Sequence, residues 1–235
     1  MHFSLLSYNI RKGKGASGFA DAFGSVLRAM EEEMPDILLC QEVFHASRED
    51  HAQSALLAEA LGLSVAYEPN KHRRIGHHGN ATLSHFPIIS SKNHDLSVNR
   101  IERRGVLHTL LKVKGAPVHI LNVHLGLTHR QRVRQLAKMA DLVERTLPPN
   151  DAIVLAGDFN DWRGRLDPVI RELGFENAVN EVDERLVRTF PPRRPRWPLD
   201  RVYVRKIRVE SASVLDGGLF EKASDHLPIA VRMSL

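Results

Sequence analysis

A carboxylate and a carboxamide directly follow an apolar run in the segment VLAGDFNDW, residues 154–162. Residues two positions apart in an extended chain project to the same side, so Asp158 and Asn160 are expected to point together. Gly157 precedes them and has no side chain to keep another group away from the backbone. The segment is therefore either a strand end that runs into a turn or one half of an active site.

Polar side chains also stand at the ends of other strand-like runs. The runs SYNI, QEV, NVHL, LDRVYV and SDHLPI contain six of them: Asn9, Glu42, His124, Asp200, Asp225 and His226. Each one alone could be a turn former, a helix-entry residue, a cap or a satisfied core histidine. Together they need a common explanation, because burying an isolated ionised carboxylate is costly unless it has a partner or a metal ion. Carboxylate and amide oxygens suit Mg²⁺, whereas no Cys/His spacing indicates structural zinc.

Strands must hold these groups in place, and the apolar runs predict eight of them. The expected strands are Phe3–Ile10, Ile37–Val43, Asn80–Phe86, Val106–Val113, Val118–Leu125, Ala152–Ala156, Val202–Val204 and Ile229–Met233. Several of them follow one another without a helix between them, so a simple alternating parallel fold does not fit. Sheets packed on each other with helices outside do fit.

Helical spacing of apolar residues predicts four helices. The first contains Phe19, Phe23, Val26, Leu27 and Met30 and ends before Pro35. The second covers residues 50–61 and ends at Gly62, and the fourth lies around residues 166–173. The third has an expected buried face of Val133, Leu136, Ala137, Ala140 and Val143, with a solvated face of Arg130, Arg132 and Arg134.

The composition describes a globular chain with a basic surplus. Its 235 residues include 33 Lys and Arg against 28 Asp and Glu, which favours anionic partners such as phosphates or nucleic acid. The one cysteine, Cys40, lies in the apolar run ILLCQEV and is expected to be a buried structural thiol. No apolar run approaches the roughly 20 residues of a membrane helix, and the start lacks a secretory signal pattern. We expect one domain over residues 1–235, a monomer in the cytoplasm without a membrane segment.

Taken in order, the runs SYNI, QEV, GNATLS, NVHL, GDFND, LDRVYV and SDHLPI resemble the motifs of the endonuclease/exonuclease/phosphatase superfamily, the DNase I-like and exonuclease III-like metal-dependent phosphoesterases. They extend from residue 7 to residue 229, and GDFN and SDHLPI are specific together. The resemblance implies an α+β fold, a four-layer α/β/β/α sandwich of two packed mixed β-sheets flanked by helices. It also implies metal-dependent hydrolysis of a phosphate ester at one edge of the sheets.

The resemblance implies a magnesium site and a water-activating group. Glu42 resembles the family's principal Mg²⁺ ligand, with Asn9 and Asp225 near the same ion and Mn²⁺ as an alternative metal. Asp158 resembles the carboxylate that orients or deprotonates the attacking water. Asn160 resembles the amide that steadies the phosphate.

The resemblance also implies roles for two histidines. His226 resembles the histidine poised on the scissile phosphate as base or transition-state stabiliser, and Asp200 the carboxylate that fixes its ring. His124 resembles a leaving-group acid or phosphate contact, and Asn80 is expected at the rim of the site. Two features depart from the family pattern: Arg201 replaces a common histidine, and the chain has no room for the long DNA-gripping loops of abasic endonucleases.

Basic residues cluster in loops and strand ends, several of them beside these motifs. They could ring the site and neutralise phosphates, or they could be ordinary solvated loop residues. Among them we take Arg104 and Arg194 as the candidates for substrate binding. Trp197 could stack on a base or pack beneath its proline-rich loop. The clusters are Arg11/Lys12/Lys14, Lys71/Arg73/Arg74, Arg103/Arg104 and Arg193/Arg194/Arg196.

Three functions remain open at this stage. The first is a Mg²⁺-dependent phosphodiesterase or nuclease that acts on DNA or RNA. The second is a phosphatase or phosphodiesterase for small or lipid phosphoesters, as in the sphingomyelinases and inositol phosphatases of the family. The third is an inactive phosphate-binding module, which is disfavoured because every chemical position is filled.

Overall fold

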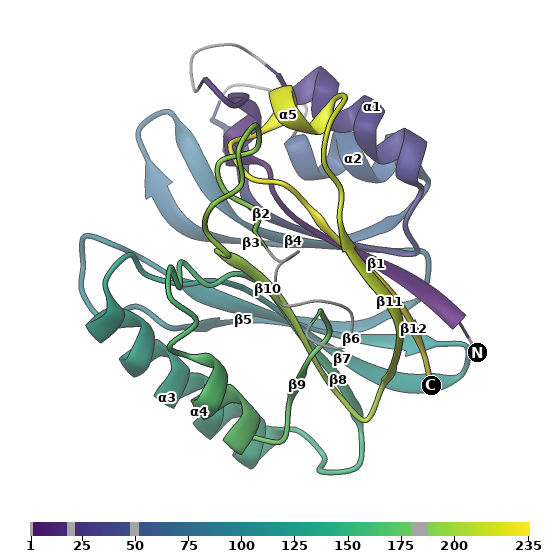
Figure 1. The fold of residues 1–235 in the computed structure, drawn as a ribbon, viewed down its shortest axis with the longest axis vertical. Coiled ribbons are helices and arrows are strands. Elements are labelled where there is room, and N and C mark those ends of the chain that lie inside the picture. Colours follow the sequence, from purple (N-terminus) through teal and green to yellow (C-terminus); the bar gives the residue numbers. More distant parts are fainter. Residues whose placement is uncertain (1, 18–21, 48–51, 180–187) are drawn as a thin grey trace.

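The computed structural model describes residues 2–17, 22–47, 52–179 and 188–235. Within these ranges, twelve strands form two six-stranded sheets, and helices cover the outer face of each sheet (Figure 1). Each sheet combines parallel and antiparallel pairs. This is the four-layer α/β/β/α sandwich of two mixed sheets that the sequence predicted.

The first sheet has the strand order β11-β12-β1-β2-β4-β3. Its strands are β1 (His2–Asn9), β2 (Ile37–Ala46), β3 (Ser64–Arg73), β4 (Gly76–Ser84), β11 (Arg208–Val214) and β12 (Ile229–Ser234). β1 is parallel to β2 and antiparallel to β12. The end of β1, at Asn9, therefore lies near the segment that enters β12 and contains Asp225 and His226.

The second sheet has the strand order β5-β6-β7-β8-β10-β9. Its strands are β5 (Ile88–Asp95), β6 (Gly105–Val113), β7 (Ala116–His124), β8 (Ala152–Asp158), β9 (Glu176–Asn177) and β10 (Asp200–Arg205). β8 is parallel to β7 and antiparallel to β10. The ends of β7 and β8 and the start of β10 therefore meet at one end of the sheet.

The helices form the two outer layers (Figure 1). The first sheet is covered by α1 (Phe23–Glu33), α2 (Gln53–Leu61) and α5 (Phe220–Ala223), and the second by α3 (His129–Thr146) and α4 (Asp167–Glu172). A short 3₁₀ turn, Arg11–Gly13, follows β1. None of the helices in the described ranges has both the length and the apolar character needed to cross a bilayer.

Three apolar layers hold the sandwich together. The middle layer lies between the sheets and includes Leu39 and Val154. One outer layer packs Leu136 of α3 against the second sheet, and the other packs Met30 of α1 against the first. Cys40 belongs to the latter layer, where burial raises the pKa of its thiol, so it is the buried structural thiol that the sequence predicted.

The predicted strands and the four predicted helices are all present, with shifts of a few residues at their ends. Phe19 and residues 50 and 51, which were expected to be helical, lie outside the described residues. The prediction lacked four strands and one short helix: β3, β5, β9, β11 and α5.

The buried face of α3 differs from the prediction. Val133 is 47 % exposed and Ala137 is exposed, whereas Arg132 is buried. The Arg132 guanidinium is not solvated: it donates to the carbonyl oxygens of Gly126 at 3.2 Å and Leu127 at 2.7 Å. The expected face was rotated by about one position, because a buried arginine bonded to a loop cannot be recognised from apolar spacing.

Candidate active site

A cavity of about 480 Å³ opens where the ends of the two sheets meet. The chain termini lie at the opposite end of β1 and β12 (Figure 1). Side chains from both sheets and from the loops that follow or precede their strands form the walls. Eight of the predicted site residues line it: Asn9, Glu42, Arg104, His124, Asp158, Asn160, Asp225 and His226.

Strand register brings three functional side chains into one row. His124 lies opposite Asp158 in the parallel β7–β8 pair, and Asp200 lies opposite Asp158 in the antiparallel β8–β10 pair. Gly157 allows β8 to approach β7 closely, because a Cβ there would lie 2.0 Å from the carbonyl oxygen of Val123. A larger residue at this position would force β8 away from β7 and displace Asp158.

Two amide groups hold the Asp158 carboxylate. The side-chain amide of Asn9 donates to its Oδ2 at 3.0 Å, and the backbone amide of Asn160 donates to its Oδ1 at 2.9 Å. Burial, opposed by the nearby His226 and assisted by Asp200, raises the pKa of the Asp158 carboxyl above its ordinary value. A raised pKa makes this carboxylate a stronger base than an ordinary aspartate.

Asn160 reaches the cavity by a route that the sequence did not predict. β8 ends at Asp158, and Asn160 has a φ of 50°, so the two residues do not share one face of an extended strand. The side-chain amide of Asn160 donates to the carbonyl oxygen of Leu125, just after β7, at 3.0 Å. Both side chains line the cavity, but the geometric reason that the sequence suggested was wrong.

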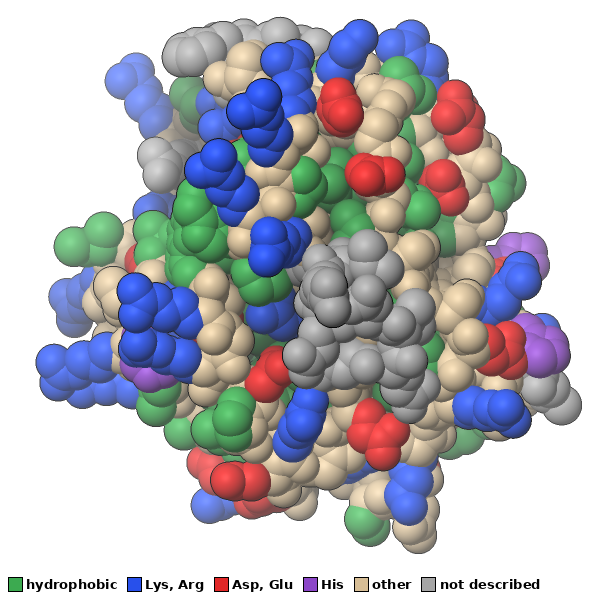
Figure 2. All heavy atoms as spheres, in the orientation of Figure 1, with side chains coloured by type: hydrophobic (Ala, Val, Ile, Leu, Met, Phe, Trp, Pro, Cys, Tyr) green, Lys and Arg blue, Asp and Glu red, His purple; other side chains and the backbone are tan. Residues whose placement is uncertain are grey.

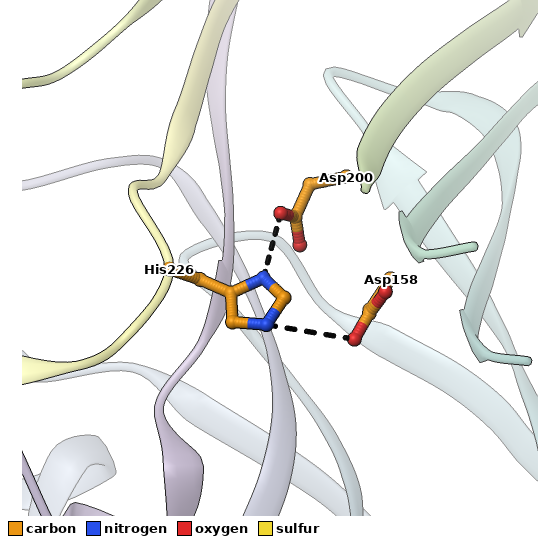
Figure 3. Close-up of side chains that lie close together, drawn as sticks. All are labelled: Asp158, Asp200 and His226. Atoms are coloured by element: carbon orange, nitrogen blue, oxygen red, sulfur yellow. Dashed lines mark hydrogen bonds and ion pairs between the residues drawn. The ribbon is translucent and has the colours of Figure 1, made fainter. Parts of the chain in front are cut away.

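Figure 3 shows the His226 ring between two carboxylates. Its Nδ1 lies 2.8 Å from Oδ2 of Asp200, and its Nε2 lies 3.9 Å from Oδ2 of Asp158. Burial favours the neutral ring, but the Asp200 and Asp158 carboxylates outweigh it and raise the pKa of His226 to about 10. The ring is therefore an imidazolium cation at neutral pH.

A hydroxyl group fixes the carboxylate behind this ring. Thr189 donates from Oγ1 to Oδ2 of Asp200, and the Asp200 amide donates to the same Oγ1 at 3.3 Å. Asp200 is buried and does not itself line the cavity. It orients the His226 ring so that Nε2 faces Asp158. Sequence reasoning missed Thr189, because nothing in its local pattern marks it as a partner of a residue 11 positions later.

Two further acids in the cavity wall pair with basic residues that follow β1. Lys12 Nζ is hydrogen-bonded to Glu42 Oε2, and Arg11 Nε lies 3.0 Å from Asp225 Oδ2. Burial alone would raise the pKa of Glu42, but the charge and hydrogen bond of Lys12, together with the charges of Arg104 and His78, outweigh burial and lower that pKa. Burial raises the pKa of Asp225 despite the opposing charges of His226 and Arg11.

These acids fit a hard divalent cation. Glu42, Asp225 and the side-chain carbonyl of Asn9 offer only oxygen ligands, which is the donor set that Mg²⁺ takes. In this structure Lys12 and Arg11 contact the two carboxylates, and each would have to turn away from the oxygen that it pairs with before that oxygen could ligate an ion. The residues therefore fit the metal that the sequence predicted.

The group of Asp158, Asp200 and His226 could also hold a metal ion. One ligand atom from each lies within 4.8 Å of the others, and all three residues are buried. An imidazole must be neutral to ligate a metal, whereas the two carboxylates keep His226 protonated. With His226 protonated, the oxygen set is the better match to Mg²⁺.

His124 and Arg104 complete the polar wall. His124 Nε2 lies 3.3 Å from Oδ2 of Asp158. Burial and the Arg104 charge hold the pKa of His124 well below its ordinary value, so its ring is neutral. Arg104 donates from Nη2 to Glu102 at 2.9 Å and borders the cavity.

Two predicted substrate contacts lie outside the cavity lining. Asn80 is 1 % exposed and does not lie at the rim; it donates to the carbonyl oxygen of Asn122 at 3.0 Å, between the two sheets. β4 is an inner strand, so an inward-facing side chain on it is covered by the opposite sheet. Arg194 lies exposed in the loop before β10.

A cluster of three aromatic rings lies beside the His226 ring, and the sequence did not predict two of the three. Trp162 lies 6.0 Å from Phe190 and 5.1 Å from Trp197, measured between ring centroids. The Phe190 ring lies 5.2 Å from that of His226. Trp162 and Phe190 line the cavity, and Trp162 is 39 % exposed. The sequence separates these rings widely, and only Trp197 was expected near the site.

The fold and this cavity define a member of the endonuclease/exonuclease/phosphatase family. The family's sequence model matches residues 6–226, so the chain belongs to that family, whose members are phosphoester hydrolases and typically depend on a metal ion. The curated protein YbhP of Escherichia coli K12, itself uncharacterized, is 33% identical over 245 residues, covering 99% of this chain and 96% of YbhP.

Solved structures share the fold. An endonuclease/exonuclease/phosphatase from Beutenbergia cavernae has a TM-score of 0.83 at 19% identity, covering 100% of this chain and 72% of that one. A humanized D. rerio TDP2 has a TM-score of 0.78 at 16% identity, covering 100% of this chain and 99% of that one. These likenesses extend over the full α/β/β/α sandwich.

Proposed function

We propose that this protein is a Mg²⁺-dependent phosphodiesterase that hydrolyses nucleic-acid phosphodiester bonds with an activated water molecule. The observation that carries the proposal is the convergence of two groups in one cavity. The first is the buried chain Asp158–His226–Asp200, and the second is the pair of acids Glu42 and Asp225. The first can move and stabilise charge at a phosphate, and the second can hold a cation beside it.

Asp158 is the group that orients the attacking water and accepts its proton. A base works best when its pKa lies near the working pH, and burial raises the pKa of Asp158 towards that range. Hydrogen bonds from Asn9 and from the Asn160 backbone hold the carboxylate in one orientation. The side-chain amide of Asn160 donates one N–H to the carbonyl oxygen of Leu125, and its second N–H can donate to a phosphate oxygen.

His226 stabilises negative charge as it develops on the phosphate. Its ring is cationic and buried, and a fixed charge in such a site needs no reorganisation during the reaction. Asp200, which accepts a hydrogen bond from Thr189, also accepts one from Nδ1–H of His226. The Nε2–H of the ring therefore remains available to donate to the phosphate. The neutral ring of His124 offers one N–H to the phosphate or to the leaving group.

Glu42, Asp225 and Asn9 are the residues that would hold Mg²⁺. When bound, the ion would supply positive charge that polarises a phosphoryl oxygen. Arg11 and Lys12 contribute positive charge at the same acids and border the cavity that receives the phosphate.

A polynucleotide is the substrate class that the surface favours. Arg193, Arg194 and Arg196 are exposed in the loop before β10. Figure 2 shows Lys and Arg side chains gathered over this loop, beside an apolar patch. Phosphates that flank the scissile one would meet these charges, and exposed Trp197 lies beside them.

The test is a hydrolysis screen with Mg²⁺ or Mn²⁺ across DNA, RNA, bis-p-nitrophenyl phosphate, p-nitrophenyl phosphate and phospholipids. His226→Ala protein, purified in the same way, reports contaminating activity. We expect cleavage of DNA or RNA and of the nitrophenyl diester, loss of both with chelator, and loss of both in the variant. Cleavage of only a monoester or a lipid would move the assignment to the second substrate class. If no substrate is hydrolysed with either metal, the remaining assignment is an inactive phosphate-binding module.

A further inference from the structure

A second cavity lies beside the active-site cavity and shares one wall residue with it. It has a volume of about 440 Å³ and is formed by the last part of β3, the end of β5 and the loop that leads into β6. Arg104 lines both cavities. An anion in the second cavity would therefore lie next to a phosphate bound in the first.

Cations dominate the lining of this second cavity. Among the described residues, its lining contains four basic side chains, those of Lys71, Arg100, Arg103 and Arg104, and one carboxylate, that of Asp95. A second carboxylate, that of Glu102, pairs with Arg104 from outside the lining. The remaining polar side chains are those of Asn70, His72, Asn93 and Ser97, and each of them can donate a hydrogen bond. A concave surface with this surplus attracts and concentrates anions.

Two of these cations, Lys71 and Arg103, are only weakly engaged by the protein itself. Lys71 donates to the neutral carbonyl oxygen of Ile101 at 2.7 Å. Arg103 lies 3.8 Å from Asp95, and their side chains are 48% and 64% exposed, so solvent screens this ion pair. Each of them is free to turn its charge towards an incoming anion.

Arg104 supplies the link between the two cavities. Its Nη2 donates to Glu102, but its Nε is buried and has no hydrogen-bond partner among the described residues. The guanidinium carries further N–H donors in a planar fork that matches phosphate oxygens. Arg104 can therefore contact a phosphate from the wall that the two cavities share.

We propose that this second cavity binds a second phosphate group of the substrate whose scissile phosphate occupies the active-site cavity. The proposal rests on the phosphodiesterase function proposed above and adds a specificity: the substrate carries at least two phosphates. A neighbouring phosphate of a polynucleotide and the second phosphate of a small bisphosphate offer the same chemistry.

The test compares two single-stranded DNA 12-mers. One has a phosphate at every linkage, and the other keeps one central phosphate and has neutral methylphosphonates elsewhere. In wild-type protein we expect kcat/KM to be at least about tenfold higher for the fully charged strand, mainly through KM. Lys71→Ala and Arg103→Ala should each shrink this ratio about threefold or more. Lys112→Ala, at the far end of β6, removes a charge elsewhere and should keep the wild-type ratio.

A small-molecule pair distinguishes the two sources of the second phosphate. The pair consists of 4-nitrophenyl phosphodiesters of 1,3-propanediol with and without a terminal phosphate. A gain from the terminal phosphate that Lys71→Ala and Arg103→Ala remove would support a cavity that recognises any second phosphate. A gain confined to the DNA pair, and removed by the same variants, would support a polynucleotide. The proposal is wrong if the extra phosphates give no gain on either pair, or if the variants lose activity equally on charged and neutralised substrates.

A binding measurement distinguishes a failure of this proposal from a failure of the proposed phosphodiesterase function. If the wild-type protein hydrolyses neither strand, fluorescence anisotropy measures the affinity for both labelled 12-mers. Tighter binding of the charged strand that Lys71→Ala and Arg103→Ala abolish would keep the second cavity as an anion site. Equal affinity for both strands would overturn it. Unchanged melting temperatures of the variants show that the fold is intact.

Discussion

Nδ1 of His226 lies 2.8 Å from Oδ2 of Asp200, a residue 26 positions earlier in the chain, and both side chains are buried. The other nitrogen of a histidine ring is fixed in direction and protonation by such a bond. Here Nε2 is left facing Asp158 (Figure 3), and both His226 and Asp158 line the cavity. The proposed catalysis therefore depends on a pair of residues of which only one touches the substrate.

This relationship predicts a non-additive double mutant. His226→Ala should lower kcat by at least about a hundredfold, the scale for losing a positioned charge-stabilising group. Asp200→Asn should give a smaller loss in kcat with little change in KM, because it acts through the ring. The double mutant should resemble His226→Ala alone in steady-state assays of a nitrophenyl diester. Losses that multiply would show that Asp200 has a role independent of His226.

Removal of one carboxylate charge should weaken metal activation. Glu42→Gln keeps the shape of the side chain, and we expect the Mg²⁺ concentration for half-maximal activity to rise at least about tenfold, since even the outer partners of metal ligands change affinity by roughly 10–100-fold. Mn²⁺ should raise the melting temperature of the wild-type protein more than that of the variant. Glu172→Gln, exposed on α4, is the matched control. Identical metal titrations for Glu42→Gln and wild type would contradict the assignment, as would full activity in excess chelator.

The strands missing from the prediction share one property. β11, β3, β5 and β9 are the four edge strands of the two sheets. An edge strand is only partly covered, so it can carry polar residues at most positions, and the stretch SSKNHD within β5 is an example. Inner strands are covered on both faces and leave the apolar runs that can be read from sequence. The predictable part of the fold is therefore the interior of each sheet.

The sequence predicted those site residues that lie at the ends of strands. Asp158 and His226 follow or precede apolar runs, so their positions stand out in the sequence. Thr189 and Phe190 reach the site through contacts with Asp200 and His226 that are distant along the chain, and no local pattern signals such contacts. The buried position of Asn80 was missed because sequence alone does not show which sheet face is covered.

The loop before β10 should govern affinity for a charged polymer. Arg193, Arg194 and Arg196 are exposed there. Replacing all three with alanine should raise KM for DNA or RNA and flatten the dependence of log K on log salt concentration by about 0.7–0.9 for each phosphate that the loop no longer neutralises. Turnover of bis-p-nitrophenyl phosphate should change little, because it has no flanking phosphate.

The control for the loop variant removes three charges near the chain termini. The residues are exposed and lie away from the cavity: Lys112, Arg208 and Arg232. An equal flattening in this control would mean that overall charge, not the loop, sets the salt dependence. Equal losses on DNA and on the small diester would instead assign the loop arginines to the catalytic centre or the fold.

A histidine pair on β6 and β7 should make the protein sensitive to acid. His108 Nε2 lies 2.9 Å from His119 Nδ1, and His119 Nε2 lies 3.0 Å from Asp151. Burial, with the neighbouring His119 and His94, lowers the pKa of His108 to about 4. The ordinary histidine pKa is about 6.5, so between these values the unfolded chain binds a proton at this position and the folded chain does not. Stability should therefore fall as pH decreases from about 6.5 to about 4.

His108→Gln removes this titration and keeps a polar side chain beside His119. Allowing for partial exposure, we expect the variant to lose about 1 kcal/mol less stability than wild type between pH 7.5 and pH 5, which is about 2–4 °C in melting temperature for a chain of this size. At pH 7.5 the variant should be equal to or slightly less stable than wild type, because a hydrogen bond to His119 is altered. His129→Gln, exposed at the start of α3, should follow the wild-type curve. Parallel melting curves for His108→Gln and wild type across this range would mean that His108 titrates alike in the folded and unfolded chains.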